Sequence, residues 1–428
     1  MSENYITVDT HFYAQSGFAF PSTAFEDNGI PIVRMSDLKD GQLKFENTKF
    51  VSENWLNLAN EYLLKENDFL LGMSGSLSNY AVVTKDKVPA LLNQRVARLR
   101  SKSNSHSYEY VSYWLKSNFY HHYADIQGEG AAQKNISSKQ IGLFKYRDAL
   151  KNEQMVIVKI LRTIDQAIEK TEALIEKYQQ IKAGLMHDLF TRGIGVDGKL
   201  RPPREQAPEL YQLTPTGWIP KDWNYAQIKH YVRSAQYGIS TSLSDSEVGI
   251  PVLRMNNIQS NKFDIADLKY TTDLEAFKIM LRKGDVLYNR TNSMEHVGKI
   301  AIWRDELQEC SFASYLVRIN LYENLVLPDF FSYWMSQVSS QNALRRYATP
   351  AVQQVNINPT NLQRVYIACP KNIKEQRLIS EKIDILDIKL STEKITLDKL
   401  RDEKSGLMHD LLTGKVQVPI NRVEAAHV

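Results

Sequence analysis

The sequence predicts an α+β protein: two tandem, pseudo-twofold-related globular domains separated by two long antiparallel coiled-coil helices. Three observations carry this prediction. The chain nearly repeats itself about 220 residues apart, each copy begins with a strand-rich pattern, and each copy ends in a heptad pattern. With 428 residues the chain is long enough for two hydrophobic cores and connecting helices.

The duplication extends from one end of each copy to the other. Residues 29–35 (GIPIVRM) return as 249–255 (GIPVLRM), residues 112–114 (SYW) return as 332–334, and residues 184–189 (GLMHDL) return letter for letter as 406–411. Solenoid repeats are only 20 to 50 residues long. A single duplication of this length therefore indicates two whole domains of the same architecture.

Each copy begins with short apolar runs broken by Gly, Pro, Asn and Asp. Residues 96–99, 286–287 and 300–302 are examples, and such runs are typical of strands in a mixed α+β domain. Trp114 and Trp334 occupy matching positions in predicted helices, so we expect them to pack in the two cores.

The last part of each copy has apolar residues at alternating spacings of three and four, which predicts a heptad seam on a long helix. The ordinary alternative is a helix packed on its own domain, but the duplication favours pairing of the two helices with each other. About 35 residues would form a rod of roughly 50 Å. Four polar residues in the seam are expected to set its register, and Lys182 and Glu393 are a hypothetical pair. These seam residues are Thr171, Lys182, Glu393 and Lys404.

Between the copies, residues 192–216 are rich in Gly and Pro, which favours a linker without helix or paired strand. Gly193 and Gly414 stand where C-terminal helix caps are expected. The predicted divisions are domain 1 at 1–150, spacer helix 1 at 151–192, a linker at 193–213, domain 2 at 214–372, spacer helix 2 at 373–414 and a tail at 415–428.

Composition excludes several classes of protein. The formal net charge is only +4, so nucleic-acid binding would depend on local patches. Cys310 and Cys369 are the only cysteines, which argues against a disulfide framework or a cysteine zinc site. We find neither a signal peptide nor a transmembrane pattern, so we expect a cytoplasmic protein that does not bind membranes.

With these features assembled, the chain resembles the specificity subunit of type I restriction-modification systems. The resemblance rests on two variable domains, each followed by a long helix that ends in GLMHDL and then Thr191-Arg192-Gly193 or Leu412-Thr413-Gly414. Residues 217–223 (GWIPKDW) and 237–241 (YGIST) also look like the start of a recognition domain in this family. The first copy lacks the WIPxxW segment, so its first strand or N-terminal packing is expected to differ.

The resemblance implies a division of labour. The two domains would be target-recognition domains that read a split site in double-stranded DNA, and the rod length would set the unread gap. Two methyltransferase subunits would dock on the helices, and restriction and translocase subunits would complete the complex. No cofactor is expected on this chain, whereas S-adenosylmethionine, ATP and Mg would belong to those partners.

No convincing catalytic constellation occurs in the sequence. A phosphate-binding loop, a HExxH zinc motif and the Asn/Asp-Pro-Pro-aromatic motif of amino-methyltransferases are all missing. The pairs His187-Asp188 and His409-Asp410 suggest a metal dyad, but neighbouring residues on a helix point about 100° apart, so we expect no metal site there. We therefore predict no catalytic residues and a non-catalytic subunit.

Candidate DNA contacts are Arg, Lys, Asn and Gln side chains of the recognition copies, because Arg reads guanine and Asn or Gln reads adenine through paired hydrogen bonds. The ordinary alternative for each is a solvated surface residue. Arg98 and Arg318 lie within apolar strands and have a structural alternative, and Arg34 and Arg254 share a repeat signature that favours a common fold role. The candidates are Arg95, Arg98, Gln133, Lys134 and Asn135 in the first copy, and Arg290, Asn292, Arg345, Arg346, Gln353, Gln354 and Asn356 in the second.

Two other functions stay open. A duplicated DNA-modifying enzyme would bind S-adenosylmethionine by itself. A coiled-coil scaffold without DNA readout would show no salt-dependent DNA binding, either alone or with its partners.

Overall fold

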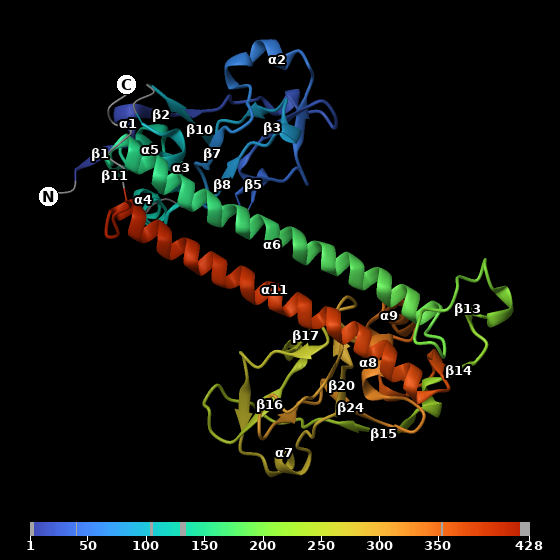
Figure 1. The fold of residues 1–428 in the computed structure, drawn as a ribbon. Coiled ribbons are helices and arrows are strands. Elements are labelled where there is room, and N and C mark those ends of the chain that lie inside the picture. Colours follow the sequence, from blue (N-terminus) through green and yellow to red (C-terminus); the bar gives the residue numbers. More distant parts are fainter. Residues whose placement is uncertain (1–3, 40, 103–105, 129–133, 352–353, 420–428) are drawn as a thin grey trace. The chain divides into compact units, whose positions relative to one another are not determined.

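The computed structural model describes residues 4–39, 41–102, 106–128, 134–351 and 354–419. The chain divides into two compact units, unit 1 (1–173 and 395–428) and unit 2 (174–394). Two helices of 41 residues each, α6 (Lys151–Thr191) and α11 (Ile373–Thr413), contribute one part to each unit. They are the long green and red helices of Figure 1. Each unit therefore contains the sheets of one copy and a segment of both long helices.

Unit 1 is built on a four-stranded antiparallel sheet with the order β2-β10-β7-β8. A three-stranded sheet of order β6-β3-β9 accompanies it, with β3 and β9 parallel. The remaining strands form the pairs β1-β11 and β4-β5. The strands are β1 (Tyr5–Thr7), β2 (Phe12–Ser16), β3 (Ile30–Val33), β4 (Leu38–Lys39), β5 (Gln42–Leu43), β6 (Lys49–Val51), β7 (Phe69–Gly72), β8 (Tyr80–Val82), β9 (Leu91–Leu92), β10 (Val96–Ser101) and β11 (Lys145–Arg147).

Helices cover the four-stranded sheet of unit 1 and bury its core. Phe12, Phe69 and Leu99 of the sheet pack in one cluster with Trp114, which is 2% exposed. The expectation that Trp114 packs in the core is confirmed. Helices α1 (Val8–His11), α3 (Tyr108–Lys116), α4 (Asn118–Gln127) and α5 (Ser138–Gly142) contribute to this cluster, whereas α2 (Trp55–Leu58) packs on the sheet of β3 and β6.

Unit 2 repeats the topology of the two larger sheets of unit 1. Its four-stranded sheet has the order β15-β24-β20-β22, and its accompanying sheet has the order β19-β16-β23 with β16 and β23 parallel. The sequence duplication thus corresponds to two α+β domains of one architecture. The strands are β14 (Trp223–Gln227), β15 (Val232–Tyr237), β16 (Ile250–Leu253), β17 (Ile258–Gln259), β18 (Lys262–Phe263), β19 (Lys269–Thr271), β20 (Val286–Asn289), β21 (Thr291–Asn292), β22 (Ile300–Ile302), β23 (Ser311–Phe312), β24 (Leu316–Leu321), β25 (Thr349–Ala351), β26 (Gln354–Asn356) and β27 (Tyr366–Pro370).

Helices bury the core of unit 2 in the same way. Phe330 and Trp334 pack with Val317 and Ile319 of β24, and Trp334 is 8% exposed, as expected for a core residue. The helices of this unit are α7 (Leu274–Lys278), α8 (Pro328–Ser336), α9 (Val338–Arg345) and α10 (Pro359–Leu362).

A close backbone approach explains one glycine of each copy. A Cβ on Gly17 would stand 2.2 Å from the Leu92 carbonyl oxygen, and a Cβ on Gly238 would stand 2.3 Å from that of Phe312. The next residue in each copy donates its backbone N–H to that same oxygen, at 2.9 Å in both cases. Only glycine lets the end of the first sheet strand lie so near the neighbouring segment.

The connection between the copies differs from the predicted linker. Residues 211–214 form strand β12 (Tyr211–Thr214), which pairs with β13 (Gly217–Pro220) in a two-stranded hairpin. Pro215 lies in the turn, where its missing N–H costs no ladder hydrogen bond, so the Pro-rich composition does not prevent a strand. The prediction that this segment supplies no paired strand was therefore wrong.

The first copy does possess a first strand, although it lacks the WIPxxW segment. Strand β1 pairs with β11 in an antiparallel register, as β14 pairs with β27 in the second copy. The predicted difference between the copies is in the length of this first strand, because β1 has three residues and β14 has five.

The long helices end as expected from their glycines. Gly193 and Gly414 follow α6 and α11 with φ angles of 64° and 76°, a backbone conformation that favours glycine. The seam positions are buried or half-buried along both helices. Leu161 and Ile164 belong to the buried set in unit 1, and Ile379 and Ile383 belong to it in unit 2.

Candidate nucleic-acid interface

In the second copy, several predicted DNA-contact residues meet on one small sheet. Strand β21 pairs with β26, and β26 pairs with β25, so Asn292, Gln354 and Asn356 lie on adjoining strands. The amide of Asn356 donates to the Thr291 hydroxyl at 2.8 Å. All three predicted side chains are half-buried, so the sheet holds them while leaving part of each accessible.

Arg290 comes directly before this sheet and is held by a neighbouring loop. Its Nε donates to the carbonyl of Ser314 at 2.9 Å, and its backbone N–H donates to the carbonyl of Tyr315 at 3.0 Å. The guanidinium group lies 4.9 Å from the centre of the Tyr237 ring, a cation–π arrangement. A planar cation held on an aromatic face is pre-organised to meet a base edge or a phosphate.

Tyr237 and Tyr315 were missed by the sequence reasoning, which assigned most aromatic residues to the cores. They are 47% and 45% exposed, unlike the buried Tyr113 and Tyr333 of the repeated segments. Exposed aromatic rings beside an Arg are suited to contact bases or sugars. Their position could have indicated a surface role, because Tyr237 is the last residue of β15 and Tyr315 directly precedes β24. Both lie beside polar residues.

Arg345 and Arg346 lie at the end of α9, just before β25. Arg345 is half-buried and donates to the backbone carbonyl of Glu295 at 2.9 Å. Arg346 is exposed. Arg346 is therefore the more accessible of the two, whereas Arg345 also ties α9 to the loop that follows β21.

The first copy has the same backbone framework. The N–H of Ile136 donates to the carbonyl of Met73 at 2.9 Å, as the N–H of Ile357 donates to that of Arg290 at 2.8 Å. The N–H of Met73 donates to the carbonyl of Arg95 at 3.0 Å. Arg95 thus occupies the place that Tyr315 has in the second copy.

Side chains on this shared framework differ between the copies. Where the second copy has Arg290 and Tyr315, the first has Met73 and Arg95, whereas Asn135 and Ile136 recur as Asn356 and Ile357. A fold role would favour the same side chain in both copies. Different side chains on matching backbone are expected of surfaces that bind different partners.

The other candidates of the first copy have mixed outcomes. Arg95 and Asn135 are exposed, and exposed Lys134 forms an ion pair with Asp125 at 2.7 Å. The predicted contacts Gln133 and Gln353 lie outside the described residues.

Arg98 is a correction, because its side chain is completely buried. It donates to Asp68 at 3.0 Å and to Gln15 at 2.8 Å, besides the backbone carbonyl of Leu63 at 2.6 Å. Burial lowers the pKa of Arg98, and its hydrogen bond to Asp68 opposes that shift. A guanidinium enclosed by these partners is not offered to DNA.

Arg318 has the corresponding partners in the second copy, with a side chain that is 11% exposed. It donates to Asp285 at 2.6 Å, to the carbonyl of Met280 at 3.0 Å and also to Gln236. The structural alternative therefore holds for both strand arginines.

Arg34 and Arg254 also share one fold role. Each donates to the backbone carbonyl of the residue thirteen positions later, Asn47 at 2.6 Å and Asp267 at 3.2 Å. Matching contacts in both copies agree with the expected structural role.

The polar residues of the helical seam have partners other than the predicted pair. Lys182 lies 2.5 Å from Asp387 of α11, so the hypothetical pairing with Glu393 was wrong. Lys404 lies 2.6 Å from Asp165 of α6. The register of the two helices explains these partners, because each lysine side chain contacts the carboxylate that lies opposite it on the other, antiparallel helix.

A tyrosine of each recognition copy joins these ion pairs. Tyr113 donates its hydroxyl to Asp165 at 2.7 Å, and Tyr333 donates to Asp387 at 3.2 Å and to Asp384 at 2.5 Å. Thr171, by contrast, donates to the carbonyl of Ala167 within its own helix at 2.8 Å. Each copy is thus connected to both long helices through one carboxylate.

The two His-Asp pairs use their carboxylates in local ion pairs. Asp188 lies 3.3 Å from Arg192, and Asp410 lies 3.2 Å from Lys415. Among the described residues, no group of three or more His, Cys, Asp or Glu side chains is arranged to hold a metal ion.

Comparison with known families decides the identity of these repeated domains. The model of the type I restriction modification DNA specificity domain matches residues 12–180 and 220–401, one match for each copy.

The chain belongs to this family. It is thus a specificity subunit, the non-catalytic component of a type I restriction-modification system, and its two domains are the two specificity domains.

Several specificity subunits resemble this one in sequence. The EcoBI specificity subunit of Escherichia coli is 23% identical over 89% of this chain and 78% of its own length. The putative MjaX specificity subunit of Methanocaldococcus jannaschii is 28% identical over 48% of this chain, and the match spans 49% of that protein. The match to the EcoBI subunit therefore covers most of this chain, and the match to the MjaX subunit covers about half of it.

Solved structures support the fold assignment. The S subunit of a type I restriction-modification system from M. genitalium matches with a TM-score of 0.58 and 14% identity, over 96% of each chain. A second structure, which concerns complex assembly and conformational transition of the type I R-M system, matches with a TM-score of 0.54 and 12% identity, over 97% of this chain and 99% of that one. In the described part of this specificity subunit, no helix is sufficiently long and apolar to cross a membrane.

Proposed function

We propose that this specificity subunit reads a bipartite target in double-stranded DNA, with one domain for each half-site. The observation that carries the proposal is the shared framework of the two copies. Their matching backbone hydrogen bonds hold Arg95 and Met73 in one copy and Tyr315 and Arg290 in the other. Two surfaces of common geometry and different chemistry suit two half-sites of different sequence.

The long helices would form the spacer between the half-sites. Their seam residues are buried or half-buried, and each unit has a lysine–aspartate pair between α6 and α11. These features support an antiparallel coiled coil that relates the two domains by a pseudo-twofold axis. A rigid spacer would make the unread gap in the DNA a property of helix length.

The catalytic steps would belong to partner subunits. Two methyltransferase subunits would carry S-adenosylmethionine, and the restriction and translocase subunits would use ATP and Mg. The likeness in fold to a structure that concerns complex assembly of the type I R-M system supports a complex of this kind. Because such a complex acts on cellular DNA, the cytoplasm is its proposed location.

Mapping adenine methylation in cells that carry the gene with its partner genes tests this function. Deletion of this chain alone is expected to abolish methylation at one split motif. Exchange of residues 214–372 for the corresponding domain of another specificity subunit is expected to change one half of the motif and to leave the other half and the gap unchanged.

The exchange of residues 1–150 is the matched control, because it should change the other half only. An unchanged methylation pattern after deletion would contradict DNA readout and would leave a coiled-coil scaffold as the better explanation. Binding of S-adenosylmethionine by the isolated chain would instead favour an enzyme.

A further inference from the structure

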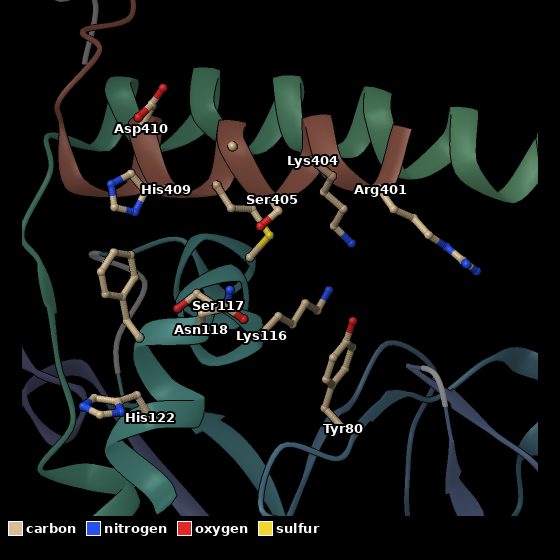
Figure 2. A pocket seen from close by; sticks show the side chains of 13 residues that line it. Tyr80, Lys116, Ser117, Asn118, His122, Arg401, Lys404, Ser405, His409 and Asp410 are labelled. Carbon is tan, nitrogen blue, oxygen red and sulfur yellow. The ribbon is translucent and has the colours of Figure 1, made fainter. Parts of the chain in front are cut away.

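Unit 1 contains a cavity of 670 Å³ that lies apart from the residues assigned to DNA reading. It is bounded by β8, the junction of α3 with α4, and the last turns of α11. Figure 2 shows Lys116 and Lys404 extending into it from opposite sides, with the Tyr80 hydroxyl directed to the same region. Its cationic side chains, Lys116, Lys404 and Arg401, outnumber the single lining carboxylate, Asp410.

Lys116 differs from the other two cations of the cavity in its direct partners. Lys404 pairs with Asp165 at 2.6 Å, and Arg401 pairs with Glu172 at 2.7 Å. The Lys116 ammonium has no ion pair or hydrogen bond within the part of the chain that the structure describes. It lies instead 4.7 Å from the centre of the Tyr113 ring.

Two further rings complete the surroundings of this ammonium. The centres of Phe69 and Tyr80 lie 5.5 and 5.7 Å from it. Aromatic faces stabilise a cation but leave its hydrogen-bond donors unused. The three donors of Lys116 are therefore available to a ligand in the cavity.

The start of α4 adds positive potential to the same cavity. Ser117, the residue before the helix, uses its hydroxyl to donate to the Trp114 carbonyl at 2.6 Å and does not cap the helix. Ser117, Asn118 and Phe119 all line the cavity. The positive end of the α4 dipole therefore lies at the lining of this cavity.

Apolar and aromatic side chains supply the rest of the lining. The Phe119 ring stacks on His409, with centres 5.4 Å apart, and Met408 is buried beside them. A free inorganic anion would contact only the part of the cavity that Lys116 and Lys404 line. The volume and the aromatic wall suit an anion attached to an organic group.

The duplication shows that the fold does not require this lysine. The matching segment of the second copy, aligned on residues 112–114 and 332–334, has Ser336 in place of Lys116 and Val338 in place of Asn118. Ser336 donates to the Tyr333 carbonyl at 2.8 Å. Both copies have a lysine–aspartate ion pair between the long helices, but only the first copy has a lysine at the position of Lys116.

We infer that this cavity binds a phosphate ester, with the phosphate group between Lys116 and Lys404 and the organic group against the aromatic wall. Lysine ammonium groups and a helix N-terminus are the donors that proteins use for phosphate. The phosphate ester is either a free nucleotide or one backbone unit of bound DNA. Only the second source rests on the proposed function.

Titration of the full chain with adenosine monophosphate, followed by calorimetry, tests the first source. We expect one site per chain, no binding of adenosine, and a loss of affinity of at least tenfold in Lys116→Met. Lys116→Arg keeps the charge and should bind within about threefold of the wild type. Lys139→Met removes an exposed lysine of the same unit and is the matched control, with no expected effect.

The salt dependence of DNA binding tests the second source. If the ligand is a backbone phosphate, Lys116→Met should reduce the slope of log K against log salt by about 0.9, the value for one phosphate contact. Lys139→Met should leave the slope unchanged. A wild-type chain that binds no DNA, alone or with its partners, would refute the proposed function without refuting a nucleotide site.

Two results overturn the inference. In the first, adenosine monophosphate binds equally to the wild type and to Lys116→Met, which would place the ligand elsewhere. In the second, the nucleotide does not bind and Lys116→Met causes no change in DNA binding. Circular dichroism and thermal unfolding of each variant ensure that a loss of binding is not a loss of folding.

Discussion

The ammonium group of Lys404 lies 2.6 Å from the carboxylate of Asp165, and the same relationship recurs in unit 2 between Lys182 and Asp387 at 2.5 Å. In both units the lysine comes from the late part of one long helix and the aspartate from the early part of the other. Their side chains are 18–24% exposed, so solvent screens these pairs only partly. Each pair fixes the register of the antiparallel helices in its unit.

Charge reversal at Lys404 and Asp165 tests this role. Each single reversal places like charges opposite each other and should destabilise unit 1, and the double reversal should recover part of the loss. For residues in one network a coupling free energy of roughly 0.5–3 kcal/mol is expected from a double-mutant cycle in urea. The matched cycle on Lys182 and Glu393 should show a coupling within the additivity limit of about 0.5 kcal/mol. A coupling as large for Lys182 and Glu393 would contradict the observed register.

The heptad pattern could predict which helix faces are buried but not how the two helices are staggered. A seam repeats every 3.5 residues, so shifting one helix by a heptad preserves its pattern. The stagger depends on the domains at the helix ends and on the linker, which no local pattern describes. For this reason Thr171, Lys182, Glu393 and Lys404 were recognised as exceptions, while Asp165 and Asp387 were missed as partners.

The recognition domains show a similar limit. The duplication predicted their shared architecture, because similar segments at the same spacing indicate the same fold. The side chains that face DNA were harder to choose. Arg98 lies between buried Ala97 and Leu99, so strand alternation would expose it, but Asp68, thirty residues earlier, forms an enclosed partner for it. Burial of a charge is decided by such distant partners and not by the strand pattern.

Arg98 and Arg95 should separate stability from recognition. Arg98→Met leaves Asp68 without its buried partner and is expected to destabilise the chain by about 3–5 kcal/mol. Arg95→Ala removes an exposed side chain and should leave the free energy of unfolding within about 0.5 kcal/mol. If Arg95 contacts a base, specific DNA binding should weaken by about 1–3 kcal/mol. Urea denaturation and DNA titration of both variants check this contrast, and a stable Arg98→Met variant with weakened DNA binding would reverse our assignment.

Arg290 should affect the half-site of the second domain alone. It lies on the face of Tyr237 and before the small sheet of Asn292 and Asn356. Replacement by methionine keeps most of its length and removes its hydrogen-bond donors. We expect relaxed or lost methylation at one position in one half of the motif, with the other half unchanged. Sequencing of methylated DNA from cells with Arg290→Met measures this, and Arg254→Met, which alters a structural arginine of the same domain, is the control. Uniform loss across both halves would indicate a phosphate contact or a folding defect instead.

Lys116 gives the subunit a stability that depends on pH. Burial lowers the pKa of Lys116 from 10.5 to about 8; Asp165 opposes the shift, Lys404 reinforces it, and Glu109 and Glu169 oppose it. Between pH 8 and 10.5 the unfolded chain therefore binds more protons at this site than the folded chain, so this site makes the free energy of unfolding rise with pH in that window. Lys116→Met should accordingly be more stable than the wild type at pH 7, and its advantage should shrink as pH rises through 8. Urea denaturation of both proteins at pH 7 and 10 measures the difference, with Lys139→Met as the control. If the advantage is constant with pH, the pKa of Lys116 is the same in the folded and the unfolded chain, so the fold does not desolvate its ammonium group. That result would contradict a buried cation in the cavity.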